Sequence, residues 1–574
     1  MHPTGQLRIL ETTDLHMHLL GYEYFADRAD DSLGLARLAD VITARRKGAC
    51  LLCDNGDFLQ GTPLADMLAD SRHHPLAQAF NTLGYDAITL GNHEFDYGRG
   101  ALATFGRQLD APIVSANVTT LSGVAVWQPY RIIARAIPCS DGRARTIRIG
   151  VTGFAPPSLT KAKGIATQPI ATAARATIAA LQDAGADVIV ALCHGGIGGA
   201  EDESAQTIAA MEGIDVVLMG HTHDSFPDPS GPGTGMIDHV NGTLCGKPAV
   251  MAGYHGTSLG EIDLALCHQP DGWRITGHKV RLHKITQPDQ PPSPARIAIE
   301  DLATPAHQSH LVRMRVPLGP SGQPLHNQFA TVAPDPVARL LAKIMRDTVA
   351  RAIGRPCPVA AVAPFQPAGA KGRQRRITLP AGGLTYRDAS CLFPFRDRLC
   401  ALRQTGRQLR AWLARSATHY THVLPVKPPQ PLINPDSAGY FCDGLFGLHY
   451  QIDLAQPAKA DNLDRITDLR FAGRPVDDHD TFVVAATGFR RQGGGGFPVI
   501  ADDDVLWTSD QSLPEMVTDA IAAGAARDIP HEQVWSFSAA PGTTLFLERR
   551  AGEPDTLPPD WVCSTDGTGY LRHF

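Results

Sequence analysis

The stretch that decides the fold is LRILETTDLHMHLL, residues 7–20. Apolar and β-branched residues lead into Thr12 and Thr13, and Asp14 and His16 follow two positions apart. This order predicts a buried strand that ends in an acid and an imidazole. Side chains at positions i and i+2 of a strand point the same way, so we expect Asp14 and His16 to face one point in space. An isolated pair of this kind is typical of an ordinary turn, so its meaning depends on the rest of the chain.

Four further strand-like runs end in residues of the same chemistry. Each run is short, and helical patterns lie between them, which predicts an α/β sheet with helices on its faces. The motifs at these ends are DNGDF (54–58), GNHEFD (91–96), CHGG (193–196) and GHTH (220–223). Ligands of open α/β sheets gather beyond the carboxyl ends of the strands, so we expect one crevice to collect these side chains. The motifs supply Asp57, Asn92, His93, Asp96, His194, His221 and His223.

The number of nitrogen and oxygen ligands indicates two divalent ions rather than one. A single catalytic zinc has about three protein ligands and keeps one position open. Two ions about 3.5–4 Å apart that share a carboxylate stabilise both the attacking and the leaving oxygen of a phosphoryl transfer. Mixed imidazole, carboxylate and amide ligands admit Mn, Zn, Fe or Co, so the identity of the metal is left open.

Length and composition predict a globular protein with more than one domain. The chain has 574 residues, of which 43% are hydrophobic and 19% are charged, more than one ordinary core accommodates. A proline-rich stretch, QPDQPPSP (287–294), interrupts the strand–helix alternation, and a second α/β pattern begins near Pro320. We therefore expect one domain over residues 1–285, a linker over 286–319 and a second domain over 320–574.

Charge and hydropathy limit the partners. A formal net charge of −6 argues against a generally cationic surface for nucleic acid, and no apolar run is long enough to span a membrane. We expect a small-molecule substrate, no nucleic-acid polymer and no membrane partner, with the oligomeric state open. The N-terminus lacks a basic segment followed by an apolar one, which predicts a cytoplasmic protein as the sequence stands, or a periplasmic one if a leader has been removed.

The motif order DxH, GD, GNHE, H, GHxH resembles that of the calcineurin-like metallophosphoesterases. The segments at 12–19, 56–64, 91–98, 193–199 and 220–227 are similar, more narrowly, to the two-domain 5'-nucleotidase family. Within that family the finer likeness is to the bifunctional 2',3'-cyclic-nucleotide 2'-phosphodiesterase/3'-nucleotidases. It is carried by GKPAVMAGYHGTSLGEIDL (246–264), AAVAPF (360–365), SAGYFCDGLFGLHYQIDLAQPA (437–458) and AATGFRRQGGGGFP (485–498).

This resemblance implies a fold and a division of roles. The fold would be an N-terminal metallophosphoesterase domain, a β-sandwich flanked by helices, followed by a C-terminal 5'-nucleotidase-type α/β substrate-binding domain. His93, oriented by Asp96, would face the phosphate and stabilise developing charge or assist the leaving oxygen. The implied ligands are Asp14, His16, Asp57 and His223 for one ion, and Asp57, Asn92, His194 and His221 for the other, with Asp57 shared.

In the second domain, the resemblance implies that Tyr440 and Phe489 stack on the two faces of the nucleobase. Stacking of a base on an aromatic ring contributes about 1–3 kcal/mol and tolerates different bases. Gly493 and Gly494 would let the backbone approach the ligand. The sequence GGGGFP is not a phosphate-binding loop of the Walker type, because no GK[ST] follows it.

Two positions depart from the family pattern. Gly488 precedes Phe489 where the family often has Asn, and Asp397, within LFPFRDRL, stands where related enzymes often have Asn. Both departures concern the substrate pocket rather than the metal ligands.

Together these patterns predict a hydrolase of nucleotide catabolism, which converts nucleoside 2',3'-cyclic phosphates to 3'-nucleotides and these to nucleoside and phosphate. A rotation of the domains would bring the base clamp to the ions. One alternative keeps the scaffold with another substrate: a 5'-nucleotidase, a UDP-sugar hydrolase or a thiosulfohydrolase. Another alternative is a non-enzymatic nucleotide-binding protein, which the complete ligand set, with His93 and Asp96, disfavours.

Overall fold

The computed structural model describes residues 2–69, 71–157, 164–198, 204–231, 233–285, 291–363, 377–425, 428–434, 437, 439–548, 557, 560–565 and 568–574. The chain divides into two units, Met1–Val312 and Arg313–Phe574. The range 286–319, expected as a linker, contains the long helix α7 (Pro294–Met314), and the division between the units falls in its last turn.

Unit 1 contains two large sheets, the two-stranded sheets β2-β3 and β6-β9, and a set of helices. Its helices are α1 Leu35–Arg45, α2 Pro63–Leu68, α3 Pro75–Leu83, α4 Gly98–Gly106, α5 Ile170–Asp183, α6 Ala205–Ala209 and α7, with the 3-10 turn η1 His93–Phe95. Its strands are β1 Thr4–Thr12, β2 Tyr22–Glu23, β3 Arg28–Ala29, β4 Cys50–Asp54, β5 Ala87–Ile88, β6 Val118–Thr120, β7 Tyr130–Pro138, β8 Ala144–Phe154, β9 Ile165–Thr167, β10 Val188–Cys193, β11 Val216–Met219, β12 Ser225–Phe226, β13 Ile237–Asp238, β14 Thr243–Leu244, β15 Lys247–Ala252, β16 Ser258–Gln269 and β17 Gly272–Lys284.

The two large sheets of unit 1 pack face to face. One has the order β17-β16-β1-β4-β5, and the other has the order β13-β14-β15-β11-β10-β8-β7 with β12 on β15. Strand β1 is parallel to β4, and β10 is parallel to both β8 and β11. Between the sheets, Leu7 and Ile9 of β1 share a core with Val190 of β10 and Leu218 of β11.

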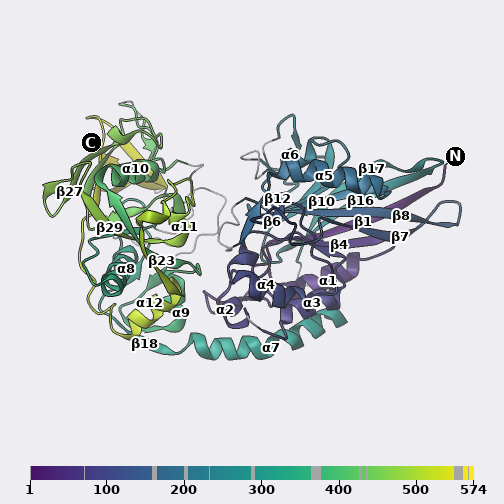
Figure 1. Cartoon of the computed structure of the whole chain (residues 1–574), viewed down its shortest axis with the longest axis horizontal. Helices are drawn as coiled ribbons and strands as arrows, with labels where there is room; N and C mark the ends of the chain where they lie inside the picture. The colour runs from purple at the N-terminus through teal and green to yellow at the C-terminus, as the bar shows by residue number, and fades with distance from the viewer. Residues whose placement is uncertain are drawn as a thin grey trace. The chain divides into compact units, whose positions relative to one another are not determined.

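Helices cover the outer faces of both sheets, so the central strands are buried on two sides (Figure 1). Leu10 of β1 packs with Leu38 of α1 and Phe80 of α3, whereas α5 and α6 pack on the other sheet. Strands that are covered on both faces have near-continuous apolar sequences. The strand–helix alternation therefore predicted this arrangement, and the expected β-sandwich flanked by helices is confirmed.

Unit 2 is a second α/β body with its own core. Its helices are α8 Pro336–Ile353, α9 Tyr386–Leu392, α10 Gly406–Ala417, α11 Gly488–Arg491 and α12 Leu513–Ala522, and its 3-10 turns are η2 Gly439–Phe441, η3 Leu463–Arg465 and η4 Asp502–Asp504. Its strands are β18 Pro317–Ser321, β19 Leu325–His326, β20 Val359–Val362, β21 Thr378–Leu379, β22 Gly382–Thr385, β23 Arg398–Thr405, β24 Gln430–Pro431, β25 Gly444–Phe446, β26 His449–Asp453, β27 Ile466–Phe471, β28 Arg474–Pro475, β29 Thr481–Thr487, β30 Val505–Ser512, β31 Trp535–Ser538, β32 Thr544–Glu548, β33 Val562–Cys563 and β34 Gly569–His573.

The main sheet of unit 2 has the order β25-β20-β29-β23-β30, and two four-stranded sheets, β24-β32-β34-β33 and β28-β27-β26-β31, accompany it. Helix α8 begins where the sequence predicts, because Asp335 accepts a hydrogen bond from the Ala338 N–H at 2.9 Å and Pro336 occupies the first turn. It ends at Gly354, whose φ of 67° requires glycine-like freedom. Strand β29 leads directly into the short helix α11, which carries Phe489.

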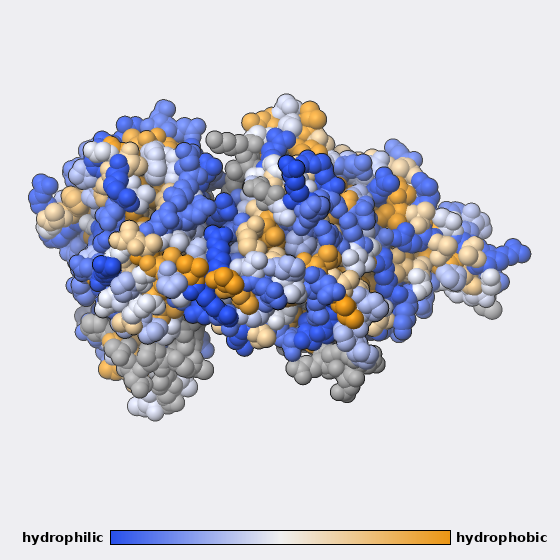
Figure 2. All heavy atoms as spheres, turned by 90° about the horizontal axis from the view of Figure 1, so that it is seen from below, coloured by the Kyte–Doolittle hydropathy of each residue, from blue (hydrophilic) through white to orange (hydrophobic). Residues whose placement is uncertain are grey.

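The surface is mixed in character. Figure 2 shows hydrophilic residues over most of the face in view, with apolar residues in smaller groups between them, as is usual for globular domains. Within the described residues, every helix is too short or too polar to cross a membrane.

A buried carboxylate on β16 supports the strand that leads into the first motif. Glu261 is fully buried beside Leu10, and its oxygens accept hydrogen bonds from Arg45 at 2.7 and 2.6 Å and from Arg281 at 3.0 Å. Burial alone would raise the pKa of Glu261, but the hydrogen bond from Arg45 and the charge of Arg8 lower the pKa to about 2.

We predict that Glu261→Gln lowers the free energy of unfolding by about 2 kcal/mol, because hydrogen bonds to charged groups contribute about 1.5–3 kcal/mol. The folded pKa of about 2 lies below the ordinary 4.5, so the stabilisation is present above pH 4.5 and is lost as the pH falls toward 2. Urea unfolding at several pH values measures the difference between wild type and variant. Asp271→Asn, in a solvent-exposed pair with Arg274, is the control and should change stability by less than about 1 kcal/mol. A difference that does not shrink below pH 4.5 would contradict the prediction.

Candidate active site

The loops after β1, β4, β5, β10 and β11 bring the expected residues of unit 1 together. The strand argument for Asp14 and His16 is wrong in its local geometry, because β1 ends at Thr12 and both residues adopt left-handed backbone, with φ of 50° and 45°. Their side chains converge nevertheless, with His16 Nε2 3.8 Å from Asp14 Oδ1. The turn, rather than the alternation of a strand, produces the convergence.

Three more of the expected ligands have left-handed backbone. The φ angles are 55° at Asp57, 76° at His221 and 60° at His223. Residues with a Cβ adopt this conformation infrequently, and such strain gathers at functional sites. The shared conformation indicates that the loops are shaped to aim side chains rather than to relax the backbone.

A first cluster consists of Asp14, His16 and His223, which are placed to hold a metal ion. The Nε2 atoms of the two histidines are 2.9 Å apart, and His223 Nε2 is 3.3 Å from Asp14 Oδ1. His16 is oriented from behind, because its Nδ1 lies 2.6 Å from the carbonyl oxygen of Gln60. This contact turns Nε2 toward the centre, as is usual for histidines that bind metals.

A second cluster consists of Asp57, His194 and His221. His194 Nε2 is 3.0 Å from Asp57 Oδ2 and 4.0 Å from Asp14 Oδ1, so the two clusters are neighbours. His194 Nδ1 lies 2.7 Å from the carbonyl oxygen of Asn55, which again directs Nε2 inward. Asn92 caps η1, and its Oδ1 is buried without a hydrogen-bond partner, which a cation at this cluster would provide.

The electrostatics of the clusters favour cations. Burial lowers the pKa of His16 and of His221 to about 4, so both imidazoles are neutral at pH 7 and able to bind a metal. Burial would raise the pKa of Asp14, but His194 and His223 lower it to about 2. Burial opposes a charge on His194, yet Asp57 and Asp14 raise its pKa to about 10. That proton balances part of the buried negative charge, which divalent ions would balance instead. The donor set, the inward Nε2 atoms and the orphaned amide oxygen therefore fit two divalent ions.

Two glycines allow these groups to approach so closely. A Cβ at Gly91 would lie 2.1 Å from Asp57 Oδ1, and a Cβ at Gly220 would lie 2.3 Å from Thr13 Oγ1. Both distances are shorter than any van der Waals contact. The glycines in GNHE and GHTH are thus required by space beside the acids.

His93 and Asp96 form a pair at the edge of the clusters. His93 Nδ1 lies 2.7 Å from Asp96 Oδ2, and the His93 N–H donates to Asp57 Oδ1 at 2.8 Å. The His93 and His16 ring centroids are 5.4 Å apart, and 20% of the His93 side chain is exposed. His93 therefore combines a fixed orientation with contact to solvent beside the clusters.

Glu94 is a functional residue that the sequence reasoning missed. Its buried carboxylate accepts four backbone N–H groups, from Asp57 at 2.9 Å, Phe58 at 2.8 Å, Leu59 at 3.1 Å and Gly91 at 2.7 Å. Burial and the charge of Asp57 raise the pKa of Glu94 to about 7. The signal was the position of the acid within GNHE, beside the expected ligand Asn92.

A second missed group follows β15. The His255 N–H donates to the carbonyl oxygen of Asp14 at 2.8 Å, and the ring of Tyr254 stacks on that of His223 with centroids 4.9 Å apart. Both residues lie in GKPAVMAGYHG, which served the sequence analysis only as a likeness. This loop closes one side of the first cluster.

In unit 2, Phe489 lies in the first turn of α11 and is partly exposed. Gly494 packs against its ring, since a Cβ there would lie 2.4 Å from Phe489 Cε2, and the Gly494 N–H donates to the Phe489 carbonyl oxygen at 2.9 Å. Gly493 has a φ of 85°. The glycines therefore fold the chain back onto the ring of Phe489. Tyr440 lies in η2, and its side chain is outside the described part of the structure.

The two departures from the family pattern are neighbours in space. Asp397 Oδ2 accepts the Phe489 N–H at 2.8 Å. A Cβ at Gly488 would lie 2.9 Å from Asp397 Oδ1. A side chain at position 488 would thus crowd the carboxylate at 397, which links the two differences.

Comparisons with known proteins agree with this geometry. The family model for calcineurin-like phosphoesterases matches residues 7–225, and that for the 5'-nucleotidase C-terminal domain matches residues 323–502. The chain is 31% identical to the trifunctional nucleotide phosphoesterase protein YfkN of Bacillus subtilis over 95% of its own length, but it spans only 40% of that protein. It is 32% identical to the 2',3'-cyclic-nucleotide 2'-phosphodiesterase/3'-nucleotidase of Salmonella typhimurium, with 91% of this chain and 87% of that protein covered.

A solved Staphylococcus aureus structure, described as a 5'-nucleotidase, matches 93% of this chain and 100% of its own with a TM-score of 0.75. Its identity of 19% supports the fold alone. Fold and site are those of a two-domain α/β metallophosphoesterase. The chain belongs to the 5'-nucleotidase family of calcineurin-like phosphoesterases and is a hydrolase, which confirms the family expected from the motifs.

We predict that Asp57→Asn abolishes turnover and removes metal from at least one cluster, because one carboxylate is expected to hold two cations. Metal analysis of purified wild type and variant, after loading with Mn²⁺ and desalting, measures the loss. Asp31→Asn, at an exposed acid outside the clusters, is the matched control and should retain its metal. Full metal content and wild-type rate in Asp57→Asn would remove Asp57 from this role.

Proposed function

We propose that the protein hydrolyses nucleoside 2',3'-cyclic phosphates to 3'-nucleotides, and 3'-nucleotides to nucleoside and phosphate. The observation that carries the proposal is the meeting of two ion-holding clusters with the His93–Asp96 pair at the strand ends of unit 1. The choice of substrate is supported by 2',3'-cyclic-nucleotide relatives that are 30–32% identical over 91% of this chain. Protein UshA of Salmonella pullorum, by contrast, is 24% identical over 87%.

The proposed ions would be held by the two clusters, with Asn92 completing the second and Asp57 proposed as the ligand that both ions share. When bound, two divalent ions neutralise phosphate charge and lower the pKa of a water molecule. The chain's own residues do the rest. His16 and His194 present Nε2 because carbonyl oxygens bind their Nδ1 atoms, and Glu94 holds the Asp57 loop in place through four amides.

His93 is proposed to serve the leaving oxygen. Asp96 binds Nδ1, so Nε2 is the ring nitrogen that donates to the departing ester oxygen or to developing negative charge. The carboxylate of Asp96 fixes the tautomer and stabilises an imidazolium. As the oxygen of the attacking water bonds to phosphorus, the bond from phosphorus to the ribose oxygen breaks. Its electron pair remains on the ribose oxygen, which takes the Nε2 proton of the His93 imidazolium and leaves a neutral imidazole.

The nucleobase is proposed to stack on Phe489, with Tyr440 as the opposite face. The partial exposure of Phe489 and the packing of Gly494 against one side of its ring support this role. A base held in this way fixes the ribose, so one ester oxygen lies opposite the attacking water. That selection favours cleavage of the P–O2' bond in a 2',3'-cyclic phosphate.

We predict that His93→Gln keeps the metals but lowers kcat by roughly 10²–10⁴-fold, as is typical of a positioned proton donor. Steady-state kinetics with 3'-AMP and metal analysis of the same preparation separate the two effects. The exposed His73, changed to Gln, is the matched control and should leave both unchanged. An unchanged kcat in His93→Gln, with chemistry rate-limiting, would reduce His93 to a structural residue.

We predict that 2',3'-cAMP yields 3'-AMP first, and adenosine with phosphate later. Phe489→Ala should mostly raise KM, because a stack formed equally in ground and transition states is uniform binding. Chromatography of a time course, with 5'-AMP and UDP-glucose assayed beside the cyclic substrate, measures both. Accumulation of 2'-AMP, or faster hydrolysis of 5'-AMP or UDP-glucose, would point to another member of the family while leaving the two-ion site intact.

A further inference from the structure

A buried ion pair lies directly behind the proposed nucleobase platform of unit 2. Arg490 Nε donates to Asp443 Oδ2 at 2.7 Å and Nη2 donates to Oδ1 at 2.6 Å, a bidentate arrangement. The side chains are only 5% and 3% exposed, and Trp412 Nε1 adds a third donor to Oδ2 at 2.8 Å. Taking both charges out of water costs several kcal/mol, so a buried pair is weak evidence for stability as such. Its geometry points to a role in positioning.

The same guanidinium group holds both ends of the segment 489–494. Arg490 follows Phe489 directly in α11, and its Nη1 donates to the Gly494 carbonyl oxygen at 2.6 Å. Gly494 in turn packs on the ring of Phe489. The guanidinium carbon also lies 3.9 Å from the ring centroid of Phe497, beyond the glycines. Asp443 therefore fixes the side chain of Arg490, and Arg490 in turn fixes the turn around Phe489.

A second arginine extends this support toward η2. Arg415 Nε donates to the Gly496 carbonyl oxygen at 3.1 Å, and Nη2 donates to that of Gly495. Its guanidinium carbon lies 5.2 Å from the ring centroid of Phe441, the neighbour of Tyr440 in sequence. The glycine-rich loop is thus clamped by two guanidinium groups, and that of Arg490 is paired with the buried carboxylate of Asp443.

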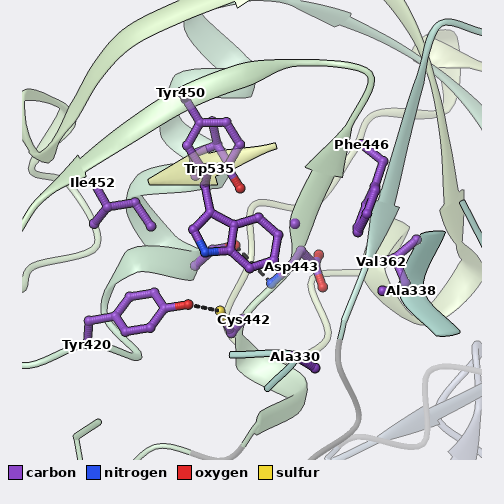
Figure 3. Close-up of a pocket in the computed structure, with 13 residues that line it drawn as sticks. Ala330, Ala338, Val362, Tyr420, Cys442, Asp443, Phe446, Tyr450, Ile452 and Trp535 are labelled. Atoms are coloured by element: carbon purple, nitrogen blue, oxygen red, sulfur yellow. Dashed lines mark hydrogen bonds between the residues drawn. The ribbon is translucent and has the colours of Figure 1, made fainter. Parts of the chain in front are cut away.

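On its other side, Asp443 borders a small cavity rather than a ligand site. Figure 3 shows Asp443 with Trp535, Phe446, Tyr450 and Tyr420 around this cavity. Its volume of about 10 Å³ holds about one water molecule and excludes a nucleobase. The Asp443 side chain is too deeply buried to touch a substrate, so its contact with the platform runs through Arg490.

We propose that Asp443 and Arg490 are positioning residues of the nucleobase platform, holding the turn from Phe489 to Gly494 in the shape that presents the ring. This inference rests on the proposed function, because it assumes that a base stacks on Phe489. The pair belongs to unit 2, whereas the ion-holding clusters and the His93–Asp96 pair belong to unit 1. It should therefore govern the binding of substrates that carry a base, and leave the chemistry of the phosphate unchanged.

The test compares a substrate with a base, 3'-AMP, and one without a nucleobase, p-nitrophenyl phosphate, on metal-loaded full-length enzyme. Asp443→Asn keeps the shape of the side chain and removes its charge. We expect KM for 3'-AMP to rise about 5- to 150-fold, the range that loss of one base stack corresponds to. We expect kcat for 3'-AMP, and both constants for p-nitrophenyl phosphate, to change less than about threefold.

Two further variants separate positioning from folding. Removal of one partner from a buried pair is strongly destabilising, so the double variant Asp443→Leu with Arg490→Met removes both charges at similar volume and should fold. We expect the same rise of KM for 3'-AMP in this variant. Arg465→Lys is the control, because Arg465 is a buried arginine of unit 2 that donates to the carbonyl oxygens of Tyr420 and Thr421 at 3.0 and 2.8 Å. It should lower the melting temperature without raising KM.

The outcomes separate the positioning role of Asp443 and Arg490 from the proposed stacking of the base on Phe489. If Phe489→Ala leaves KM for 3'-AMP unchanged, the base platform itself is wrong. If Phe489→Ala raises KM but Asp443→Asn and the double variant do not, the platform stands and the positioning role is overturned. A parallel loss of activity on p-nitrophenyl phosphate in the double variant would also overturn it, because such a loss indicates a general structural role.

Discussion

The buried carboxylates of Asp14 and Asp57 are the constraint on which the catalytic unit depends. Both are almost fully buried, at 0% and 1% exposure, and an uncompensated buried carboxylate is far costlier than an unpaired neutral polar group. Neighbouring groups of the protein offset part of that cost. Imidazoles converge on the acids, Thr13 donates to Asp14 at 2.6 Å, and the amide of His93 donates to Asp57. The proposed cations would neutralise the buried negative charge that the protein groups leave uncompensated.

The loops that hold these side chains have a strained backbone. Five of the expected ligands sit in left-handed conformation, which non-glycine residues adopt only when the surroundings hold them there. Glu94 supplies such a hold through its four amide hydrogen bonds, because it ties the loop after β4 to the turn that begins at Gly91. A second acid thus stabilises the conformation in which the first acid meets its partners, and GNHE works as a unit rather than as four separate residues.

The sequence predicted the parts of this arrangement that follow from local order. Short apolar strands, each followed by Asp, Asn or His, indicate a sheet whose carboxyl edge gathers ligands, and the two-domain fold followed from the same alternation and the family likeness. The turn of Asp14 and His16 was beyond such reasoning, because strand β1 ends at Thr12, two residues before Asp14. The role of Glu94 depends on amides 35–37 residues away, and no local pattern reports a contact at that distance. The same holds for Asp443 and Arg490, which are 47 residues apart.

Unit 2 also buries a carboxylate, but there the carboxylate is paired with a buried guanidinium group. In unit 1, buried acids are left short of positive charge, which suits a site for cations. In unit 2, Arg490 and Trp412 donate hydrogen bonds to Asp443, and Arg490 balances its charge. The pair therefore acts on the shape of the neighbouring loop. That loop is a run of glycines, the residues that lose most conformational freedom on ordering. A loop of that composition holds one conformation only if its carbonyl groups are fixed from outside, and the guanidinium groups of Arg490 and Arg415 do this at Gly494, Gly495 and Gly496. The aromatic ring of Phe489 is therefore presented by a turn whose rigidity comes from buried charge rather than from its own sequence.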